Sequence, residues 1–398
     1  MRVPDRPLSP RSLLRALHRR CRDLGLPPPA AFLGHWRDSA AVLVPSVALD
    51  VADPEHVFTG SDRLVVVGYR SFPDAAPGGA PVLPAAVRGV ADGVLTRCAD
   101  GRWSAHGDAP DPVEVVRRYG RPGDDDEVAP APDWCAPDRD AHHAAVTDCL
   151  EAIRSGEIYQ ACLSTRLHGR LRAGPLETFL TVARRAPAAR SAYLEGPWGA
   201  VLGFSPEEYL VRDGDRVRSS PIKGTLPADR DPAELRGSVK DVAENIMIVD
   251  LVRNDLGRVA DTGSVTVTDL LAVRPAPGVH HLVSTVTAAT RVDNDALVAA
   301  TFPPASVTGT PKQRARELIR GWEPRSRGLH CGAYGLAVGD DLELAVAIRT
   351  LEAAPDGRVE LGVGGGITID SCPDAEWAEC LHKAAFTWGG GPPPWEQR

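Results

Sequence analysis

The chain has 398 residues, 43% hydrophobic and 25% charged, which is typical of a globular protein with one large domain or two ordinary ones. Its net charge of −8 provides no positive field for nucleic acid or an anionic membrane. No apolar run reaches the length of about 18 residues that spans a bilayer, and we expect a cytoplasmic protein. Its eight cysteines form no CxxC pair, so we expect reduced thiols without a zinc site or a disulfide framework.

The first part of the chain, residues 1–120, mixes one predicted helix with short strands. An arginine-rich helix is expected over 12–24, and the apolar runs 40–47 and 63–69 are typical of strands. Residues 121–139 are charged and rich in proline, which opposes helix and strand alike, and we interpret them as a linker. No chemical motif is visible before this linker.

The second part, residues 140–390, is predicted to be a separate domain, followed by a tail over 391–398 that is expected to end the chain. Its predicted elements are, in chain order, a helix over 140–155, a strand over 158–167, a long helix over 238–259, strands around 281–289 and 332–363, and a second long helix over 373–388.

Lysine is rare in this sequence. Among 45 basic residues there are four lysines, and Lys223, Lys312 and Lys383 have small or acidic neighbours, while Lys240 is the fourth. Because a guanidinium group does not lose its proton to become a nucleophile, an arginine-rich chain should keep lysine mainly where an amine is needed. We therefore expect the lysines to mark an active site, with chance survival on the surface as the alternative for any one of them.

Acidic residues recur at helical spacing on the two long helices. Asp241 and Glu244 are three positions apart on the first, as are Glu376 and Glu379 on the second, so each pair lies on one helix face. Carboxylates from two helices, with positions left for water and a substrate oxygen, are what Mg²⁺ prefers. Ordinary solvated helix charge is the alternative interpretation.

Two local predictions concern the same helices. The first helix should bury an apolar stripe, with its acidic pair at the flanks; the stripe is Val242, Ile246, Val249 and Leu256. At the start of the second helix, Ser371 and Asp374 match a capping box.

A glycine run and one arginine suggest an anion site. Residues 362–366 read Gly-Val-Gly-Gly-Gly after a predicted strand, and glycines allow main-chain N–H groups to approach an anion closely. A tightly packed turn would use the same residues. Arg349 lies among apolar residues and therefore needs an anionic partner. Together these features predict a site for a dianion.

From about residue 157 to residue 386 the chain resembles chorismate-utilising enzymes, and is most similar to aminodeoxychorismate synthase component I, with anthranilate synthase component I as the neighbouring type. The stretches that carry the resemblance are 156–160 (GEIYQ), 203–207 (GFSPE), 221–225 (PIKGT), 243–251 (AENIMIVDL), 279–284 (VHHLVS), 306–312, 347–350 (AIRT) and 364–383. The resemblance implies an α+β fold with a two-sheet β-sandwich core flanked by helices, and a Mg²⁺-dependent site for chorismate.

The resemblance also assigns roles by position in these motifs. Glu244 and Glu379 match magnesium ligands, with Asp241 and Glu376 in support. The positions implied for substrate binding are Gln160, Thr225, Arg349, Gly364, Gly365, Gly366 and Lys383, and those implied for catalysis are Lys223, Glu207, His281 and Thr308.

Two positions distinguish among the activities of such enzymes. Relatives that use water carry lysine where this chain has Gln160, and anthranilate synthases carry alanine where Lys223 stands. The resemblance therefore implies that Lys223 adds to carbon 2 of chorismate while the 4-hydroxyl leaves, that ammonia then adds at carbon 4, and that Glu207 serves as acid and base. The alternatives are amination at carbon 2, as in anthranilate or aminodeoxyisochorismate synthases, and a catalytically silent subunit that binds an amidotransferase.

Ammonia is expected from a separate glutamine amidotransferase subunit, because no cysteine lies in a nucleophile-elbow context.

Some positions depart from the pattern of the family. Residues 303–306 read Pro-Pro-Ala-Ser in place of Pro-Gly-Gly-Ser, which predicts a stiffer loop, and Cys162 replaces a common asparagine. The Leu-Leu-Glu-Ser stretch of tryptophan-regulated relatives is absent, so tryptophan feedback is not expected. The choice between folate supply and a specialised product stays open.

Overall fold

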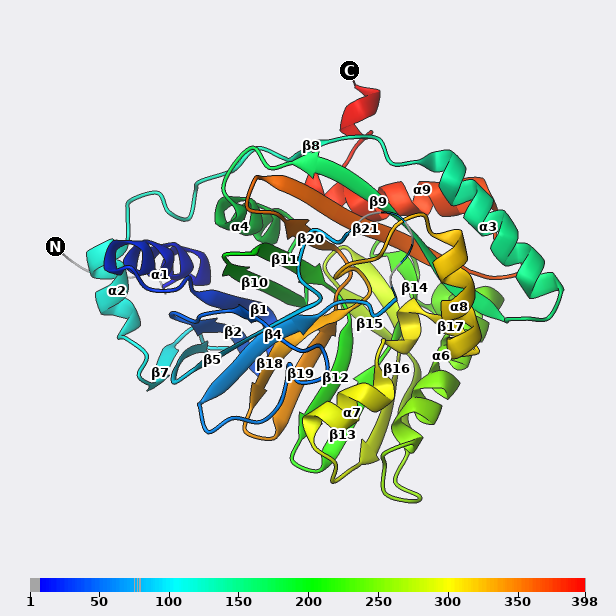
Figure 1. The fold of residues 1–398 in the computed structure, drawn as a ribbon, viewed down its shortest axis with the longest axis horizontal. Coiled ribbons are helices and arrows are strands. Elements are labelled where there is room, and N and C mark those ends of the chain that lie inside the picture. Colours follow the sequence, from blue (N-terminus) through cyan, green and yellow to red (C-terminus); the bar gives the residue numbers. More distant parts are fainter. Residues whose placement is uncertain (1–7, 75, 77, 79, 398) are drawn as a thin grey trace.

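The computed structural model describes residues 8–74, 76, 78 and 80–397, and two antiparallel sheets dominate it (Figure 1). The first sheet contains, in spatial order, β17 (Gly309–Thr310), β9 (Gln160–Arg170), β21 (Arg358–Ile367), β20 (Thr350–Ala353), β11 (Gly199–Ser205), β10 (Arg190–Gly196), β1 (Ala30–Trp36), β2 (Ser39–Val44), β6 (Gly93–Arg97) and β7 (Trp103–Gly107), with β8 (Asp133–Trp134) beside β9. The second contains β14 (Ile222–Pro227), β16 (Val279–Ala289), β13 (Arg216–Ser220), β12 (Glu208–Asp213), β19 (Asp341–Val346), β18 (Ala333–Val338), β4 (Val65–Arg70), β5 (Ala86–Ala91) and β3 (Asp50–Val51), with β15 (Thr266–Ala276) beside β16.

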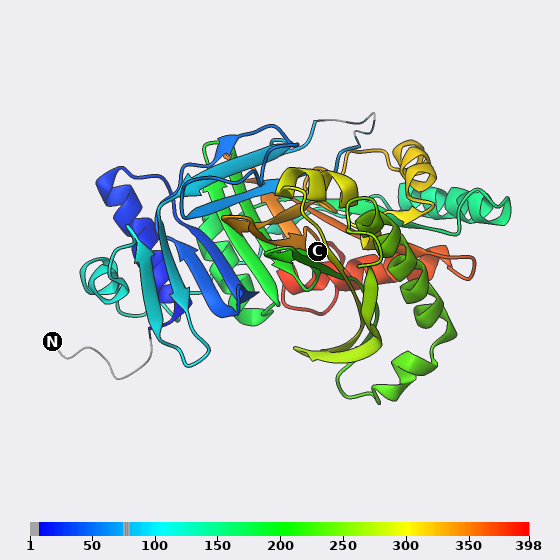
Figure 2. The same cartoon turned by 90° about the horizontal axis from the view of Figure 1, so that it is seen from below.

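The helices flank this pair of sheets. They are α1 (Pro10–Leu24), α2 (Pro112–Tyr119), α3 (Arg139–Arg154), α4 (Pro175–Arg185), α5 (Ala233–Gly237), α6 (Val239–Gly257), α7 (Asn294–Thr301), α8 (Lys312–Trp322) and α9 (Pro373–Ala384), with short 3₁₀ turns at Ala305–Val307, Ala385–Thr387 and Pro394–Glu396. As Figure 2 shows, α1 and α2 lie at one end of the molecule, and α3 and α8 at the other. The α+β sandwich expected from the resemblance is confirmed.

The core has three apolar layers. Between the sheets, side chains such as Phe32 and Val201 from the first sheet pack with Val67 and Leu336 from the second. Helices α1, α4 and α9 bury their apolar faces on the outer side of the first sheet, and α6 and α7 cover the second. Strand β11 is therefore buried on both faces, which explains why its sequence is a continuous apolar run.

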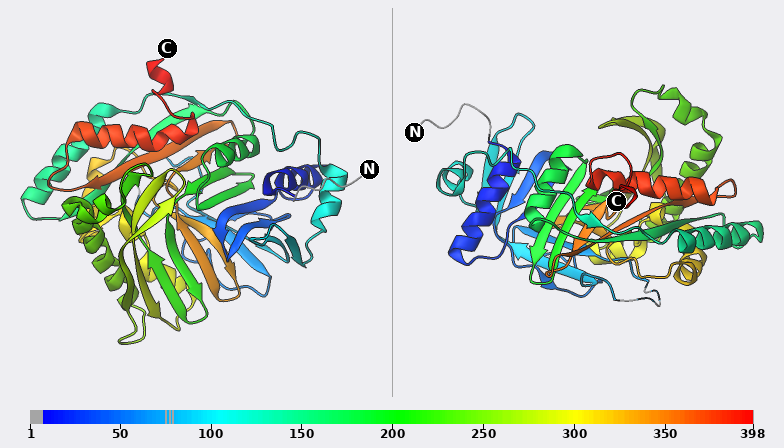
Figure 3. Two further views of the ribbon diagram at one scale, coloured as in Figure 1. Left: turned by 180° about the vertical axis from the view of Figure 1, so that it is seen from behind. Right: turned by 90° about the horizontal axis from the view of Figure 1, so that it is seen from above.

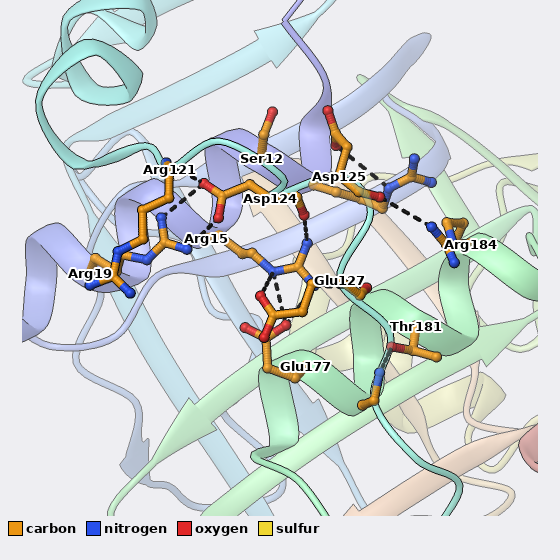
Figure 4. A network of polar contacts seen from close by, with 12 residues as sticks. Ser12, Arg15, Arg19, Arg121, Asp124, Asp125, Glu127, Glu177, Thr181 and Arg184 are labelled. Carbon is orange, nitrogen blue, oxygen red and sulfur yellow. Dashed lines mark hydrogen bonds and ion pairs between the residues drawn. The ribbon is translucent and has the colours of Figure 1, made fainter.

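The predicted linker is held by ion pairs. Arg15 of α1 donates two hydrogen bonds to Glu177 of α4, at 2.8 and 2.5 Å, and a third to the main-chain oxygen of Asp124 (Figure 4). Arg19 pairs with the Asp124 carboxylate. Strands from residues before 121 occupy both sheets beside later strands, so the two parts share one core. The domain division at 121–139 stays a prediction.

Three local predictions are wrong in whole or in part. On α6, Val249 and Leu256 are buried as predicted, but Ile246 is 48% exposed and Glu244 is buried, so the buried face is rotated toward the acidic residues. Ser371 does not cap α9: Cys372 is the N-cap residue without a side-chain cap, and the Ser371 hydroxyl donates to Glu376 at 2.6 Å. Because β21 continues to Ile367, the glycine run lies in a strand paired with β9 and not in a turn.

Candidate active site

A cavity of about 440 Å³ opens where the glycine-rich strand meets α6 and α9. Figure 3 shows α9 lying along β21 on the outside of the first sheet, and α6 beside the edge of the second. The cavity is lined by residues of both sheets and both helices, among them 222–225 of β14, His281 of β16, 362–366 of β21, Glu244 of α6, and Glu379 and Lys383 of α9.

Glycine is required at several points of β21 because charged side chains lie over the strand. A Cβ atom at Gly365 would lie 3.0 Å from Glu376 Oε2 and 3.3 Å from Glu379 Oε1. A Cβ atom at Gly366 would lie 3.1 Å from Lys223 Nζ and 3.4 Å from Glu244 Oε2. The missing side chains thus keep the strand open to the charged tips of β14, α6 and α9 and to a ligand between them.

Carboxylates and lysines alternate around this strand. Lys240 Nζ lies 3.9 Å from Glu244 Oε1 and 3.8 Å from Glu376 Oε1, and Lys223 Nζ lies 3.9 Å from Glu244 Oε2. Lys383 Nζ contacts Glu379 Oε1 at 2.6 Å and donates to the Gly364 carbonyl at 2.8 Å. Separations near 4 Å are too long for hydrogen bonds, so Lys223 and Lys240 act on these carboxylates through charge and not through direct hydrogen bonds.

The pKa values of these carboxyl groups shift in different directions. Burial raises the pKa of Glu244 and of Glu376, and the nearby lysines only partly offset this effect. Burial would also raise the pKa of Glu379, but its contact with Lys383 outweighs burial and leaves that pKa below its usual value. Glu244 and Glu376 are therefore protonated more readily than usual, and a cation bound beside them would favour their ionised forms.

The donor set fits Mg²⁺, which takes hard oxygen ligands and keeps several waters. Glu244 and Glu379 come from two helices and face the same stretch of β21, with Glu376 beside Glu379 over Gly365 and Asp241 packed against Gly224. Among the described residues no three His, Cys, Asp or Glu side chains converge as a closed cage. An ion at this site would thus be held by few carboxylates, with water or substrate oxygens completing its shell.

Glu207 and Lys223 line the same cavity, and the charge of Lys223 affects the pKa of Glu207. Glu207 is 4% exposed, and burial raises its pKa to about 7, although the nearby Ser306 hydroxyl and the charge of Lys223 both act against the rise. An acid with this pKa exchanges a proton near neutral pH, which suits it to general acid and base catalysis.

The opposite wall holds a neutral histidine and a cation. The Thr225 hydroxyl and His281 Nδ1 are 3.0 Å apart, and burial together with the charge of Arg349 lowers the pKa of His281 to about 4. Arg349 is half-buried with a φ of 48°, and within the described part of the chain no carboxylate acts on its guanidinium. A buried guanidinium without an anion favours an anionic ligand.

Some predicted site residues do not line the cavity. Gln160 is buried in β9, and its Oε1 atom has no partner among the described residues. The Thr308 hydroxyl donates to the Ala305 carbonyl at 3.0 Å. Glu376 is not among the lining residues, and its Oε1 atom accepts a hydrogen bond from the Ser371 hydroxyl. Lys312 is also elsewhere: it donates to Asp255 at 2.6 Å and to two main-chain oxygens.

Lys240 and His330 are among the lining residues that the sequence interpretation did not assign to the site. Lys240 is four positions before Glu244, a spacing that could have indicated the contact. His330 is 3% exposed, and its two ring nitrogens find no partner in the described structure. Its ring packs on Gly362, where a Cβ atom would lie 2.2 Å from its Cγ atom. No sequence motif marked this histidine.

Comparisons with known proteins agree with this geometry. Residues 93–388 match the family described as chorismate binding enzyme. The chain is 42% identical to aminodeoxychorismate synthase component 1 of Escherichia coli (strain K12) over 243 residues, 58% of this chain and 53% of that protein. It is 41% identical to anthranilate synthase component 1 of Streptomyces coelicolor over 250 residues, 60% of this chain and 49% of that protein. The chain thus matches about half the length of these relatives.

Among solved structures, anthranilate synthase component I from Streptococcus pneumoniae TIGR4 superposes with a TM-score of 0.74. The match covers 91% of this chain and 90% of that one at 23% identity, which supports the shared fold. In the part of the chain that the structure describes, no helix is long and apolar enough to cross a membrane.

Proposed function

The chain belongs to the family of chorismate binding enzymes, and from this premise we propose that it converts chorismate and ammonia to 4-amino-4-deoxychorismate. The observation that carries the proposal is the amine of Lys223 inside the same cavity as the buried acid Glu207. The similarity to aminodeoxychorismate synthase component 1 over more than half of the chain supports it. The product would serve p-aminobenzoate and folate synthesis or a specialised metabolite.

The cavity offers complementary groups for the two carboxylates of chorismate. Arg349 supplies a cation that lacks an anionic partner, and the open face of Gly364, Gly365 and Gly366 allows close approach to the strand. Lys383 is already paired with Glu379, so it fixes that carboxylate beside the strand and adds positive charge to the same wall. His281, kept neutral, would contact the ring through hydrogen bonds without repelling Arg349.

Two successive allylic displacements would then exchange the hydroxyl for an amine. The uncharged Lys223 amine forms a bond to carbon 2 while the carbon 4–oxygen bond breaks, and Glu207 gives its proton to the departing hydroxyl, which leaves as water. The Glu207 carboxylate takes a proton back from the new ammonium. Ammonia next bonds to carbon 4 while Glu207 returns this proton to the Lys223 nitrogen and the bond between that nitrogen and carbon 2 breaks, which regenerates the neutral lysine amine. The Glu207 carboxylate then takes a proton from the new ammonium group at carbon 4.

Glu244 and Glu379, with Asp241 and Glu376 in support, would hold Mg²⁺. Bound there, the ion would hold the ring carboxylate and withdraw charge from the diene. Ammonia would come from a glutamine amidotransferase subunit, since the name component 1 of the Escherichia coli relative implies a partner subunit. Ammonium salts should partly replace that subunit in vitro.

Amination at carbon 2 is the second candidate, because the identity to an anthranilate synthase component 1 is nearly as high. That reaction does not require a lysine nucleophile. The test is to incubate the purified chain with chorismate, Mg²⁺ and an ammonium salt at mildly alkaline pH, with aminodeoxychorismate lyase in half of the samples. p-Aminobenzoate formed only with the lyase supports amination at carbon 4, whereas fluorescent anthranilate without the lyase refutes it.

The nucleophile is tested separately without ammonia. The peptide that contains Lys223 should gain the mass of chorismate minus water, as seen by mass spectrometry. Lys223→Arg is the matched control, because arginine keeps the positive charge but does not act as a nucleophile. Product formation by Lys223→Ala at the wild-type rate would favour the carbon 2 reaction, and failure of the chain to bind chorismate with Mg²⁺ would favour a silent subunit.

A further inference from the structure

One lysine of the candidate active site lies between two acidic residues without a hydrogen bond to either. Lys240, in the first turn of α6, lines the cavity. Its Nζ atom is 3.9 Å from Glu244 Oε1 on the same helix and 3.8 Å from Glu376 Oε1 on α9. Because the side chain of Lys240 makes no hydrogen bond to any described residue, charge alone holds the ammonium group between the two carboxylates.

Lys240 is also able to leave this position. Its side chain is 45% exposed, whereas the side chains of Glu244 and Glu376 are 9% and 6% exposed. Lysine carries its charge on a flexible stem of four carbons, and its ammonium group is strongly hydrated. The Lys240 ammonium can therefore exchange its carboxylate neighbours for water by rotation about that stem, while the two buried carboxylates stay in place.

The other lysines of the cavity are held more firmly. Lys383 is fixed by a 2.6 Å contact with Glu379 and by a 2.8 Å hydrogen bond to a carbonyl oxygen of β21. Lys223 is 12% exposed and lies over the glycine run of the same strand. Lys240 is thus the cavity lysine that can move into solvent most readily.

The choice of lysine at position 240 fits a weakly held cation. Of the 45 lysine and arginine residues four are lysine, so arginine is the usual cation of this chain. A guanidinium group between two carboxylates would form paired hydrogen bonds and hold them strongly. The ammonium group, at nearly 4 Å from each carboxylate, attracts them without such bonds. The chain thus places beside these carboxylates a cation that another cation can replace.

We propose that Lys240 is a resident counter-cation of Glu244 and Glu376 that Mg²⁺ displaces on binding. Without the metal, the ammonium group offsets the charge of the two buried carboxylates. With a divalent ion held by Glu244 and Glu379, the ammonium is repelled and moves into solvent. Lys240 therefore keeps the carboxylates paired in the metal-free protein and lowers the affinity of the site for Mg²⁺. This inference rests on the magnesium site of the proposed function, but not on which carbon of chorismate is aminated.

The first test measures the Kd for Mg²⁺ of the full chain by isothermal titration calorimetry, without chorismate. Lys240→Met keeps most of the apolar stem and should bind Mg²⁺ about ten times more tightly than the wild type, because the repulsion between the ammonium and the metal is lost. Lys240→Arg keeps the charge and adds hydrogen bonds, so it should bind Mg²⁺ no more tightly than the wild type. Unchanged or weaker binding by Lys240→Met, or tighter binding by Lys240→Arg, would overturn the proposal.

The matched control is Arg253→Met, which removes one positive charge from an exposed position of the same helix. Position 253 lies about 20 Å from position 240 along the axis of α6. The control should bind Mg²⁺ with the Kd of the wild type. If it gained as much affinity as Lys240→Met, the effect would come from net charge alone, and the assignment to Lys240 would be refuted.

Thermal denaturation tests the metal-free state. In EDTA, Lys240→Met should melt about 2 °C or more below the wild type, because two buried carboxylates lose their counter-charge. In saturating Mg²⁺ this difference should disappear, since the metal then supplies the charge in both proteins and Lys240 lies in solvent. Equal melting temperatures in EDTA, or a difference that persists in saturating Mg²⁺, would contradict displacement.

The wild type separates this proposal from the proposed function. A wild-type chain that binds Mg²⁺ with the same Kd as Lys240→Met overturns the role of Lys240 and leaves the magnesium site intact. A wild-type chain that gives no Mg²⁺ binding overturns the magnesium site together with the role of Lys240. The position of amination is decided in either case by the assay with aminodeoxychorismate lyase.

Discussion

Replacing Glu207 with glutamine should stabilise the protein, and more so as the pH rises. The wild-type carboxyl has its pKa raised from 4.5 to about 7 by burial, so the folded chain holds a proton that the unfolded chain releases. The stability that this carboxyl contributes is fully present below pH 4.5 and is lost as the pH rises through 7. Glutamine has nearly the same shape and does not ionise, so it escapes this loss.

The size of the effect follows from the pKa difference. A shift from 4.5 to about 7 corresponds to about 3 kcal/mol when the carboxyl is fully ionised. The free energy of unfolding of Glu207→Gln relative to the wild type should therefore increase by about 2 kcal/mol between about pH 5.5 and about pH 8. Urea denaturation followed by circular dichroism at both pH values measures this difference. Turnover of the variant should fall, since glutamine neither donates nor accepts the catalytic proton.

The matched control is Glu151→Gln, which changes an exposed carboxylate on α3. Its stability relative to the wild type should not depend on pH in this range. The free energy of unfolding of Glu207→Gln relative to the wild type could instead stay constant or decrease as the pH rises. That result would show that Glu207 is already ionised in the folded protein over this pH range. The assignment of Glu207 as an acid that works near neutral pH would then be refuted.

Four further outcomes are expected. Arg349→Met should raise the KM for chorismate by about two orders of magnitude, because one charge-assisted contact is lost; steady-state kinetics measures this. Glu244→Gln should weaken Mg²⁺ activation in a metal titration while chorismate still binds. His330→Phe should raise KM more than it lowers kcat if the ring nitrogens contact substrate, and unchanged kinetics would exclude that contact. Lys312→Met should destabilise the fold by about 3 to 5 kcal/mol, and adding Asp255→Leu should recover most of the loss in thermal denaturation.

Helices and strands were predictable where local signals agreed with packing. The helices α1, α3 and α6 begin within a few residues of their predicted starts, since capping residues and periodicity point to the same boundaries. The orientation of α6 was not predictable from hydrophobicity, because its inner face meets a polar cavity. Glu244 and Asn245 are buried there, while Ile246 faces outward.

The site was predictable as a set of positions but not as a set of contacts. Family motifs located Lys223, Glu244 and Arg349, and the structure brings them around one cavity. The partners of each group depend on which distant strands become neighbours, and a linear pattern does not carry that information. His330 shows this limit, since it enters the cavity only because β21 has a glycine against which its ring can pack.

The scarcity of lysine illustrates what composition can and cannot distinguish. Lys223, Lys240 and Lys383 line the cavity, as expected if lysine is kept for chemistry. Lys312 does not, yet it is retained at a buried point where one ammonium donates to three oxygens, those of Asp255, Thr301 and Pro303. A planar guanidinium directs its donors within one plane, whereas an ammonium directs three donors to different sides. Rare lysines in an arginine-rich chain thus mark places that need a compact cation, and an active site is one such place among others.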